Sequence, residues 1–247
     1  MPSRETMPTS IEASAINVTQ IALPLSFDRQ FSFDNFVSER ADFVIASLKS
    51  LLVSGTENMV GLWGGADSGK THLLNACALF ARAQSVSFQL YDGYQLVASD
   101  PAQFDEFDGN TLLFVDNLDA VCGNRDWEAF FYGYINQCRD LDRRLVFSLS
   151  GKPQDLSCVL PDFQSRLSWG LLLELAVPGD IEIEHIIELR ARLLGLTLSR
   201  EVLAYLLSHF SRRLSDQIEL LRKLDAASLS VQKKITIPLI KQVLNNA

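Results

Sequence analysis

The stretch GGADSGKT, residues 64–71, decides the fold class of this chain. It fits the pattern GxxxxGK[ST], and it stands between an apolar run at 58–63 and a helical apolar period at 71–83. Such a loop curls backbone N–H groups around phosphate oxygens, and its lysine brings a point charge to the β- and γ-phosphates. A chance match in a chain of this length has a probability on the order of 1%. We therefore predict a P-loop phosphate site made by Gly64, Gly65, Ala66, Asp67, Ser68, Gly69, Lys70 and Thr71, with His72 beside it either at the site or only packing or capping the new helix.

The second half of a P-loop site is an apolar strand that ends in acids, and TLLFVDNLD at 111–119 supplies it. Asp116 and the Thr71 hydroxyl are predicted to hold Mg²⁺. The next residue, Asn117, stands where hydrolysing enzymes commonly carry a second acid, and an amide cannot accept a proton from water. Asp119 lies too far along the chain to replace it. These residues predict a nucleotide that is bound firmly and hydrolysed slowly, if at all.

Strand-like and helical segments alternate through the first two thirds of the chain. This alternation predicts an α/β domain with a parallel sheet covered on both faces. After Pro178 and Gly179 only helical periodicity remains, and Thr236 can cap the last helix. We predict a leader at 1–30, an α/β nucleotide-binding domain at 31–177 and a helical lid at 178–247. The predicted strands are 58–63, 85–91, 111–116, 144–150 and 169–175, and the predicted helices are 71–83, 126–141, 181–195, 201–210, 215–229 and 237–244.

Bulk properties exclude several classes of protein. The 247 residues carry a net charge of −8, which argues against strong direct binding to DNA phosphates. No apolar run is long enough to span a bilayer and no signal peptide is evident, so we expect a cytosolic protein. With three histidines and no CxxC pair, a structural zinc site is not expected. The sequence predicts buried free thiols at Cys77, Cys122, Cys138 and Cys158.

The combination of P-loop, Asp-ending strand and trailing helical domain resembles the AAA+ superfamily, whose fold is a five-stranded parallel sheet with flanking helices and a small helical lid. Within it, several segments resemble the family of the bacterial replication initiator DnaA. FSFDNFV at 31–37 resembles the adenine-recognition segment, RLVFSLS the strand that ends in the sensor-1 group, LPDFQSRLSWG the arginine-finger segment, and HFSRRLSDQIELL the sensor-2 helix. The resemblance implies base contacts from Phe33, Asn35, Phe36 and Val37, a sensor among Ser148 and Ser150, an arginine finger at Arg166, and a sensor-2 residue at Arg212 or Arg213.

Some of these residues have a plainer interpretation. Phe33 and Phe36 could belong to the core, Arg166 could be a surface ion-pair partner, and Arg212 with Arg213 could be a solvated face.

Inside the DnaA-like family, SRLSWG at 165–170 and SLSVQKKITIPLIKQVL at 228–244 resemble the Hda group of regulatory inactivators. The sequence ends at Ala247, where DnaA continues into a basic helix-turn-helix domain, so the resemblance implies a module without that DNA-binding domain. It further implies an adenine nucleotide (ADP or ATP) with Mg²⁺, DnaA and the DNA polymerase sliding clamp as partners, and association with the nucleoid or replisome. A homodimer that masks Arg166 is compatible with the sequence.

The leader contains QIALPL at 20–25, and Hda-like proteins use a short peptide of the form Q-L-x-L-P-L to dock on the sliding clamp. Its chemistry suits that role. Gln20 can hydrogen-bond to a polar rim, Ile21, Leu23 and Leu25 are apolar anchors, and Pro24 lowers the entropy lost when an extended peptide becomes ordered. The alternative is an arm that folds back on its own domain.

Two functions follow. The first is a nucleotide-bound adaptor that couples DnaA to the DNA-loaded clamp and presents Arg166 to DnaA-bound ATP, so that initiation is not repeated. The second is an autonomous AAA+ ATPase of the helicase or clamp-loader type. Lys70, Thr71, Asp116 and Arg166 suit both, whereas Asn117 and the acidic chain favour the adaptor. A scaffold that blocks DnaA by contact alone is a third alternative.

Overall fold

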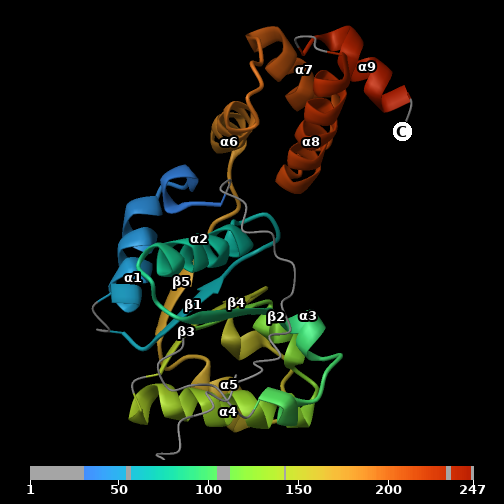
Figure 1. The fold of residues 1–247 in the computed structure, drawn as a ribbon. Coiled ribbons are helices and arrows are strands. Elements are labelled where there is room, and N and C mark those ends of the chain that lie inside the picture. Colours follow the sequence, from blue (N-terminus) through green and yellow to red (C-terminus); the bar gives the residue numbers. More distant parts are fainter. Residues whose placement is uncertain (1–30, 54–56, 105–111, 142, 232–234, 246–247) are drawn as a thin grey trace, which may run out of the picture.

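The computed structural model describes residues 31–53, 57–104, 112–141, 143–231 and 235–245. The leader peptide QIALPL at 20–25 lies outside the described residues. The described chain forms an α/β domain and a helical lid above it, joined by the segment between Glu174 and Asp180 (Figure 1).

A five-stranded parallel sheet is the centre of the α/β domain, in the order β2-β3-β4-β1-β5. The central strands are buried on both faces because helices cover both sides, and their sequences are accordingly almost all apolar. The carboxyl ends of β1, β3 and β4 lie at the same edge, which places the P-loop, Asp116 and Ser148 together. The strands are β1 (Met59–Trp63), β2 (Phe88–Asp92), β3 (Leu112–Asp116), β4 (Arg144–Leu149) and β5 (Leu171–Glu174).

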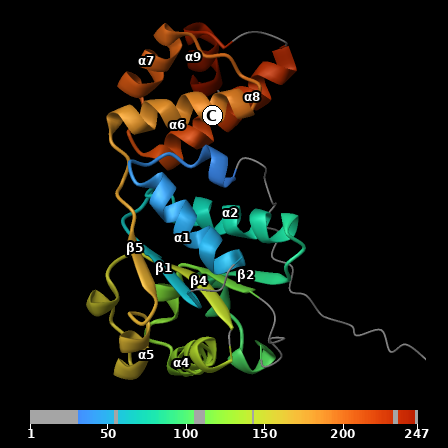
Figure 2. The ribbon, with the colours of Figure 1, turned by 90° about the vertical axis from the view of Figure 1, so that its left-hand side faces the viewer.

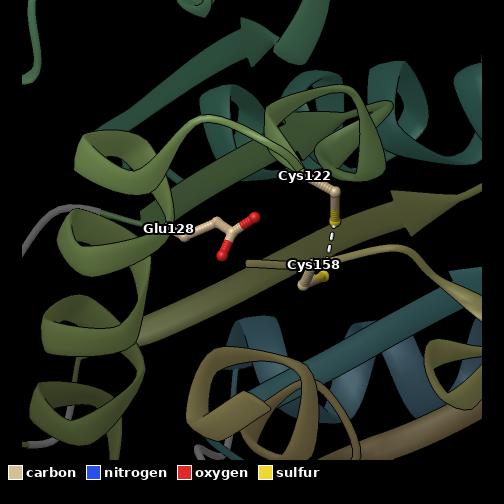
Figure 3. A group of neighbouring side chains, drawn as sticks. All are labelled: Cys122, Glu128 and Cys158. Carbon is tan, nitrogen blue, oxygen red and sulfur yellow. Dashed lines mark hydrogen bonds between the residues drawn. The ribbon is translucent and has the colours of Figure 1, made fainter. Parts of the chain in front are cut away.

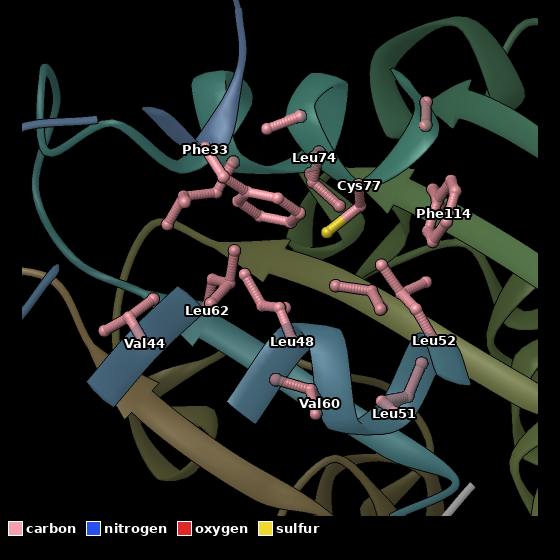
Figure 4. Close-up of a cluster of buried hydrophobic side chains, with 14 of the residues drawn as sticks. Phe33, Val44, Leu48, Leu51, Leu52, Val60, Leu62, Leu74, Cys77 and Phe114 are labelled. Carbon is pink, nitrogen blue, oxygen red and sulfur yellow. The ribbon is translucent and has the colours of Figure 1, made fainter. Parts of the chain in front are cut away.

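Two hydrophobic cores fill the space between the sheet and its helices. One lies under α1 (Ala41–Val53) and α2 (Lys70–Ala83), where Leu48, Leu62 and Leu74 are fully buried (Figure 4). The other lies on the opposite face under α4 (Arg125–Asp140) and α5 (Pro161–Arg166), around Trp127 and Phe163. The remaining short helices of this domain are α3 (Gly93–Leu96), η1 (Phe33–Asn35), η2 (Pro101–Phe104), η3 (Leu118–Val121) and η4 (Pro153–Asp155).

The lid consists of α6 (Asp180–Leu193), α7 (Arg200–His209), α8 (Leu214–Val231) and α9 (Ile237–Asn245). Its own core contains Ile187, Leu206 and Leu224. The Ser199 hydroxyl caps α7, and the Thr236 hydroxyl accepts the backbone N–H of Leu239, as the predicted cap requires. Figure 2 shows α6 crossing above the carboxyl edge of the sheet, next to the segment that begins at Phe31.

The predicted fold class is confirmed, and the predicted strands and helices differ from the observed ones only at their ends. Helices α1, α3 and α5 are not among the helices predicted from the sequence. Both α3 and α5 are shorter than two turns, with four and six residues, which is too short for helical periodicity to appear. The predicted boundary at 177/178 lies in the connection between β5 and α6. Every helix among the described residues is too short or too polar to cross a membrane.

Candidate nucleotide-binding site

The P-loop is a tight turn that ends at Gly69, the N-cap of α2. Gly69 has a φ of 90°, and an added Cβ would lie 2.8 Å from the ring of Phe36, so this position requires glycine on both grounds. Lys70 points back over the loop, and its Nζ donates to the carbonyls of Gly64 and Gly65, each at 2.7 Å. Burial lowers the pKa of Lys70, and the nearby Asp116 carboxylate opposes that shift.

Asp116 is 7% exposed and receives two hydroxyl hydrogen bonds at the end of β3. Thr71 donates to its Oδ2 at 2.6 Å, and Ser148 of the neighbouring strand β4 donates to its Oδ1. The oxygens of Thr71 and Asp116 are hard ligands of the kind that Mg²⁺ prefers. The two predicted metal ligands are therefore adjacent, and their chemistry fits a magnesium ion.

Asn117, Ser148 of β4 and Ser150 just after that strand make different contacts. Asn117 has a left-handed backbone with a φ of 52°; its N–H donates to Ser148, and its side-chain amide donates to Asp92 at 3.4 Å. Ser150 is exposed and donates to Asp119. Ser148, rather than Ser150, is thus the β4 hydroxyl that contacts Asp116.

A cavity of about 390 Å³ joins the P-loop, the segment after Phe31 and the lid. Its size lies within the usual range of small-molecule sites. A second cavity of about 430 Å³ lies at the opposite end of β1, beside Met59 and Trp169, and contains no P-loop residue. The cavity at the P-loop is lined by Phe31, Asn35, Phe36, Val37, Ser38, Ala66, Asp67, Ser68, Gly69, Lys70, Thr71, His72, Asn117, Ala176, Pro178, Glu182, Ile186, Arg190, Leu214, Ser215, Ile218 and Arg222.

His72 joins three separate parts of the site. Its Nδ1 lies 2.8 Å from the guanidinium of Arg190 on α6, and its Nε2 lies 2.8 Å from the carbonyl oxygen of Ser32. Arginine can only donate, so Nδ1 accepts and Nε2 carries the proton that is donated to Ser32. His72 is therefore a neutral imidazole that connects the P-loop helix, the lid and the N-terminal segment of the domain.

Arg190 was not identified from the sequence. It follows Ile183 by seven residues and Ile187 by three, so it lies on the same face of α6 as the buried isoleucines. An arginine on an apolar helix face is the signal that could have revealed it. The Ser215 hydroxyl makes a second connection to the lid, with a bond to Asp67 of the P-loop at 3.3 Å.

Burial lowers the pKa of His72 from 6.5 to about 4, and the Arg190 charge adds to this shift. Between these two values the unfolded chain binds more protons than the folded one, so stability falls as pH falls. We expect His72 to contribute a loss of about 2 kcal/mol at pH 5 relative to pH 7. Chemical denaturation of the wild type and His72→Asn at both pH values checks this, since the variant should lose less stability on acidification. Equal losses in both proteins would contradict the prediction.

Several predicted site residues lie outside this cavity. Phe33 is 7% exposed and packs against Phe80 in the core under α1 and α2, with ring centres 5.8 Å apart. Arg212 and Arg213 are exposed just before α8, whereas Arg222, further along that helix, lines the cavity. The polar lid residues that line the cavity are thus Glu182, Arg190, Ser215 and Arg222, beside the apolar Ile186, Leu214 and Ile218.

Arg166 lies at the end of α5, on the side of the sheet covered by α4. Its guanidinium carbon is 3.5 Å from the ring centre of Trp169, and its Nε donates to Asn136 at 3.1 Å. Arg139 of α4 also lies over the Trp169 ring, at 5.3 Å. Trp169 is 42% exposed, so Arg166 is held on an accessible aromatic surface that is separate from the nucleotide cavity.

Comparison with known proteins agrees with this architecture. A family model described as "Hda, lid domain" matches residues 180–244. Domain III of the replication initiation protein DnaA from Thermotoga maritima superposes with a TM-score of 0.75 at 18% identity, covering 89% of this chain and 97% of that one.

AMPPCP-bound DnaA from Aquifex aeolicus gives a TM-score of 0.67 at 21% identity, covering 83% of this chain and 67% of that one. The RuvB Holliday junction branch migration motor of Thermotoga maritima gives 0.66 at 18% identity, with 89% and 72% covered.

The sheet order, the P-loop and the helical lid define a P-loop α/β protein whose fold is like that of DnaA domain III. Within that fold, residues 180–244 match the family model of the Hda lid domain, and the chain as a whole is similar in structure to DnaA domain III.

Proposed function

We propose that the cavity at the P-loop binds an adenine nucleotide, ADP or ATP, with Mg²⁺. The backbone N–H groups of the P-loop and Lys70 would hold the phosphates, and Thr71 with Asp116 would hold the metal ion. Asn35, Phe36 and Val37 line the cavity on the side of the N-terminal segment and would contact the base. The bound AMPPCP of the related Aquifex aeolicus DnaA supports this assignment.

We propose further that the chain is a regulator that stimulates hydrolysis of ATP held by DnaA. The observation that carries this proposal is the position of Arg166, on an accessible surface away from its own nucleotide cavity. A guanidinium placed there can complete the site of a neighbouring AAA+ protein, and such a finger in trans raises phosphoryl-transfer rates by about 10³–10⁵. The Hda lid domain supports DnaA as that neighbour.

The surroundings of Asp116 support slow hydrolysis by the chain itself. Asn117 offers an amide that donates to Asp92, and Asp119 already accepts the Ser150 hydroxyl. Asn117 cannot act as a base, whereas Asp119 keeps one carboxylate oxygen, Oδ1, without a hydrogen-bond partner among the described residues. The proposal of slow hydrolysis therefore rests on Asn117, and the bound nucleotide would then serve to hold the lid against the α/β domain. The contacts of Arg190 with His72 and of Ser215 with Asp67 lie at that junction.

The leader peptide QIALPL would tether the regulator to the sliding clamp, which concentrates it near DnaA on replicated DNA. Burial of three apolar anchors provides a gross gain of roughly 5–9 kcal/mol, most of which is offset by ordering and association. Affinity in the micromolar range suits a tether that must be released.

Phosphate release by ATP-loaded DnaA tests the proposal directly. We expect the purified chain, with clamp-loaded DNA, to accelerate release strongly, and to show little turnover without DnaA. The rival is an autonomous motor, which the similarity of the fold to the RuvB motor keeps open. Vigorous ATP turnover by the chain alone would favour the motor and contradict the adaptor.

A further inference from the structure

Two of the four cysteines lie side by side at the base of α5. Cys122 follows η3, and Cys158 lies in the connection between η4 and α5. Their Sγ atoms are 2.7 Å apart, although the residues are separated by 36 positions in the sequence (Figure 3). Cys77 and Cys138 are 0% and 2% exposed, whereas this pair is only half-buried. Cys122 and Cys158 are therefore the more accessible of the four cysteines.

A buried carboxylate holds the two cysteine segments together. Glu128 of α4 is 0% exposed, and its Oε1 accepts the backbone N–H groups of Gly123 at 2.7 Å and Val159 at 2.9 Å. Its Oε2 accepts that of Leu160 at 2.6 Å. Gly123 follows Cys122 and Val159 follows Cys158, so one side chain fixes the backbone beside both sulfurs. The hydrogen bonds of Glu128 thus keep the two thiols close together.

We propose that Cys122 and Cys158 are a reversible oxidation site, which a low-molecular-weight disulfide such as glutathione disulfide converts to an intramolecular disulfide. The bond would tie the segment after β3 and η3 to the start of α5. A disulfide requires an S–S distance of about 2.05 Å, so the sulfurs need to move by less than about 1 Å. Glu128 keeps both backbone segments in place during that movement.

Thiol–disulfide exchange with glutathione disulfide would form the bond in two steps. The Cys158 thiolate attacks one sulfur of glutathione disulfide, which breaks its S–S bond and releases one glutathione thiolate. Cys122 then loses its proton and attacks the Cys158 sulfur of the mixed disulfide, which releases the second glutathione. Two protein thiols are oxidised and one glutathione disulfide is reduced to two thiols. The hydrogen bond from Cys122 lowers the pKa of Cys158 and raises that of Cys122, which favours Cys158 as the first nucleophile.

The same three side chains, Cys122, Glu128 and Cys158, lie close enough to be considered as metal ligands. Structural zinc sites use four ligands. Here both oxygens of Glu128 already accept backbone N–H groups, which leaves two thiols as the available donors among the described residues. The arrangement therefore suits a disulfide better than a metal ion. The experiment below also measures bound zinc, so that a metal site would be detected.

The test incubates the full chain with glutathione disulfide and then counts thiols after denaturation. We expect the count to fall from four to two and to return with dithiothreitol. Tryptic peptides containing Cys122 and Cys158 should be recovered as one linked species. Cys122→Ser should instead retain glutathione on Cys158, and Cys158→Ser should leave Cys122 as a free thiol.

Circular dichroism of the two variants checks that each has folded. Four remaining thiols in oxidised wild type would overturn the proposal, as would links that involve Cys77 or Cys138. Zinc bound at one equivalent per wild-type chain and lost in Cys122→Ser would identify a metal site and equally overturn it.

Discussion

Under the proposed function, Arg166→Ala should lower the stimulation of DnaA-bound ATP hydrolysis by about 10³-fold or more. The guanidinium is positively charged at all accessible pH values, and its planar fork can contact two oxygens of the transferring phosphoryl group. Alanine removes both properties. Because Arg166 does not line the chain's own cavity, binding of nucleotide by the variant should be unchanged. Phosphate release from ATP-loaded DnaA, with the clamp on DNA, measures the first effect, and titration with a fluorescent ADP measures the second.

Two control variants distinguish a role of Arg166 as an arginine finger from a role in packing on Trp169. Arg139→Ala removes the other guanidinium on the Trp169 ring and should leave most of the stimulation intact. Arg166→Lys keeps one charge but loses the fork, and should recover only a small part of the rate. Full stimulation by Arg166→Ala would rule out the finger and favour a scaffold that acts by contact alone.

The α/β core could be predicted from the sequence because its signals are local. The P-loop GGADSGKT and the strand ending in Asp116 can each be recognised within about ten residues of sequence. Parallel strands bring their carboxyl ends to one edge of the sheet. The adjacency of Thr71 and Asp116 follows directly from these two motifs.

The remaining contacts of the site depend on tertiary packing between distant segments. His72 and Arg190 are separated by 118 positions, and only the placement of the lid above α2 brings them together. For Phe33 the local sequence is ambiguous, because an aromatic residue in FSFDNFV suits a base pocket and a core equally well. The structure places Phe33 in the core. Cys122 and Cys158 likewise have no CxxC spacing, so their contact became visible only with the fold.

The lid contacts also suggest how the proposed nucleotide binding would be linked to the proposed regulatory role. Arg190, Ser215 and Arg222 approach the cavity from helices of the lid, while the P-loop approaches it from β1. A phosphate that attracts these side chains would stabilise one angle between the two domains. We therefore expect the bound nucleotide to act as a structural element whose loss changes the shape of the whole regulator.

Replacing Gln20 and Leu23 together by alanine should weaken capture on the sliding clamp by roughly 30- to 2 × 10³-fold. Loss of a buried leucine side chain removes about 1.5–3 kcal/mol, and loss of the glutamine hydrogen bond removes about 0.5–1.5 kcal/mol more. Capture of the full chain on immobilised clamp, followed over a range of concentrations, measures the change.

Ala22→Ser is the matched control for this pair, because residue 22 lies between the proposed anchors and carries a small side chain. It should bind like the wild type. With clamp-loaded DNA present, the Gln20→Ala, Leu23→Ala protein should also stimulate DnaA poorly, yet recover stimulation when its concentration is raised, because a tether acts by local concentration. Equal capture of the wild type and the double variant would remove the clamp from the proposed function and leave the Arg166 proposal standing. A double variant that loses capture but stimulates DnaA normally at low concentration would show that the tether is dispensable for the reaction.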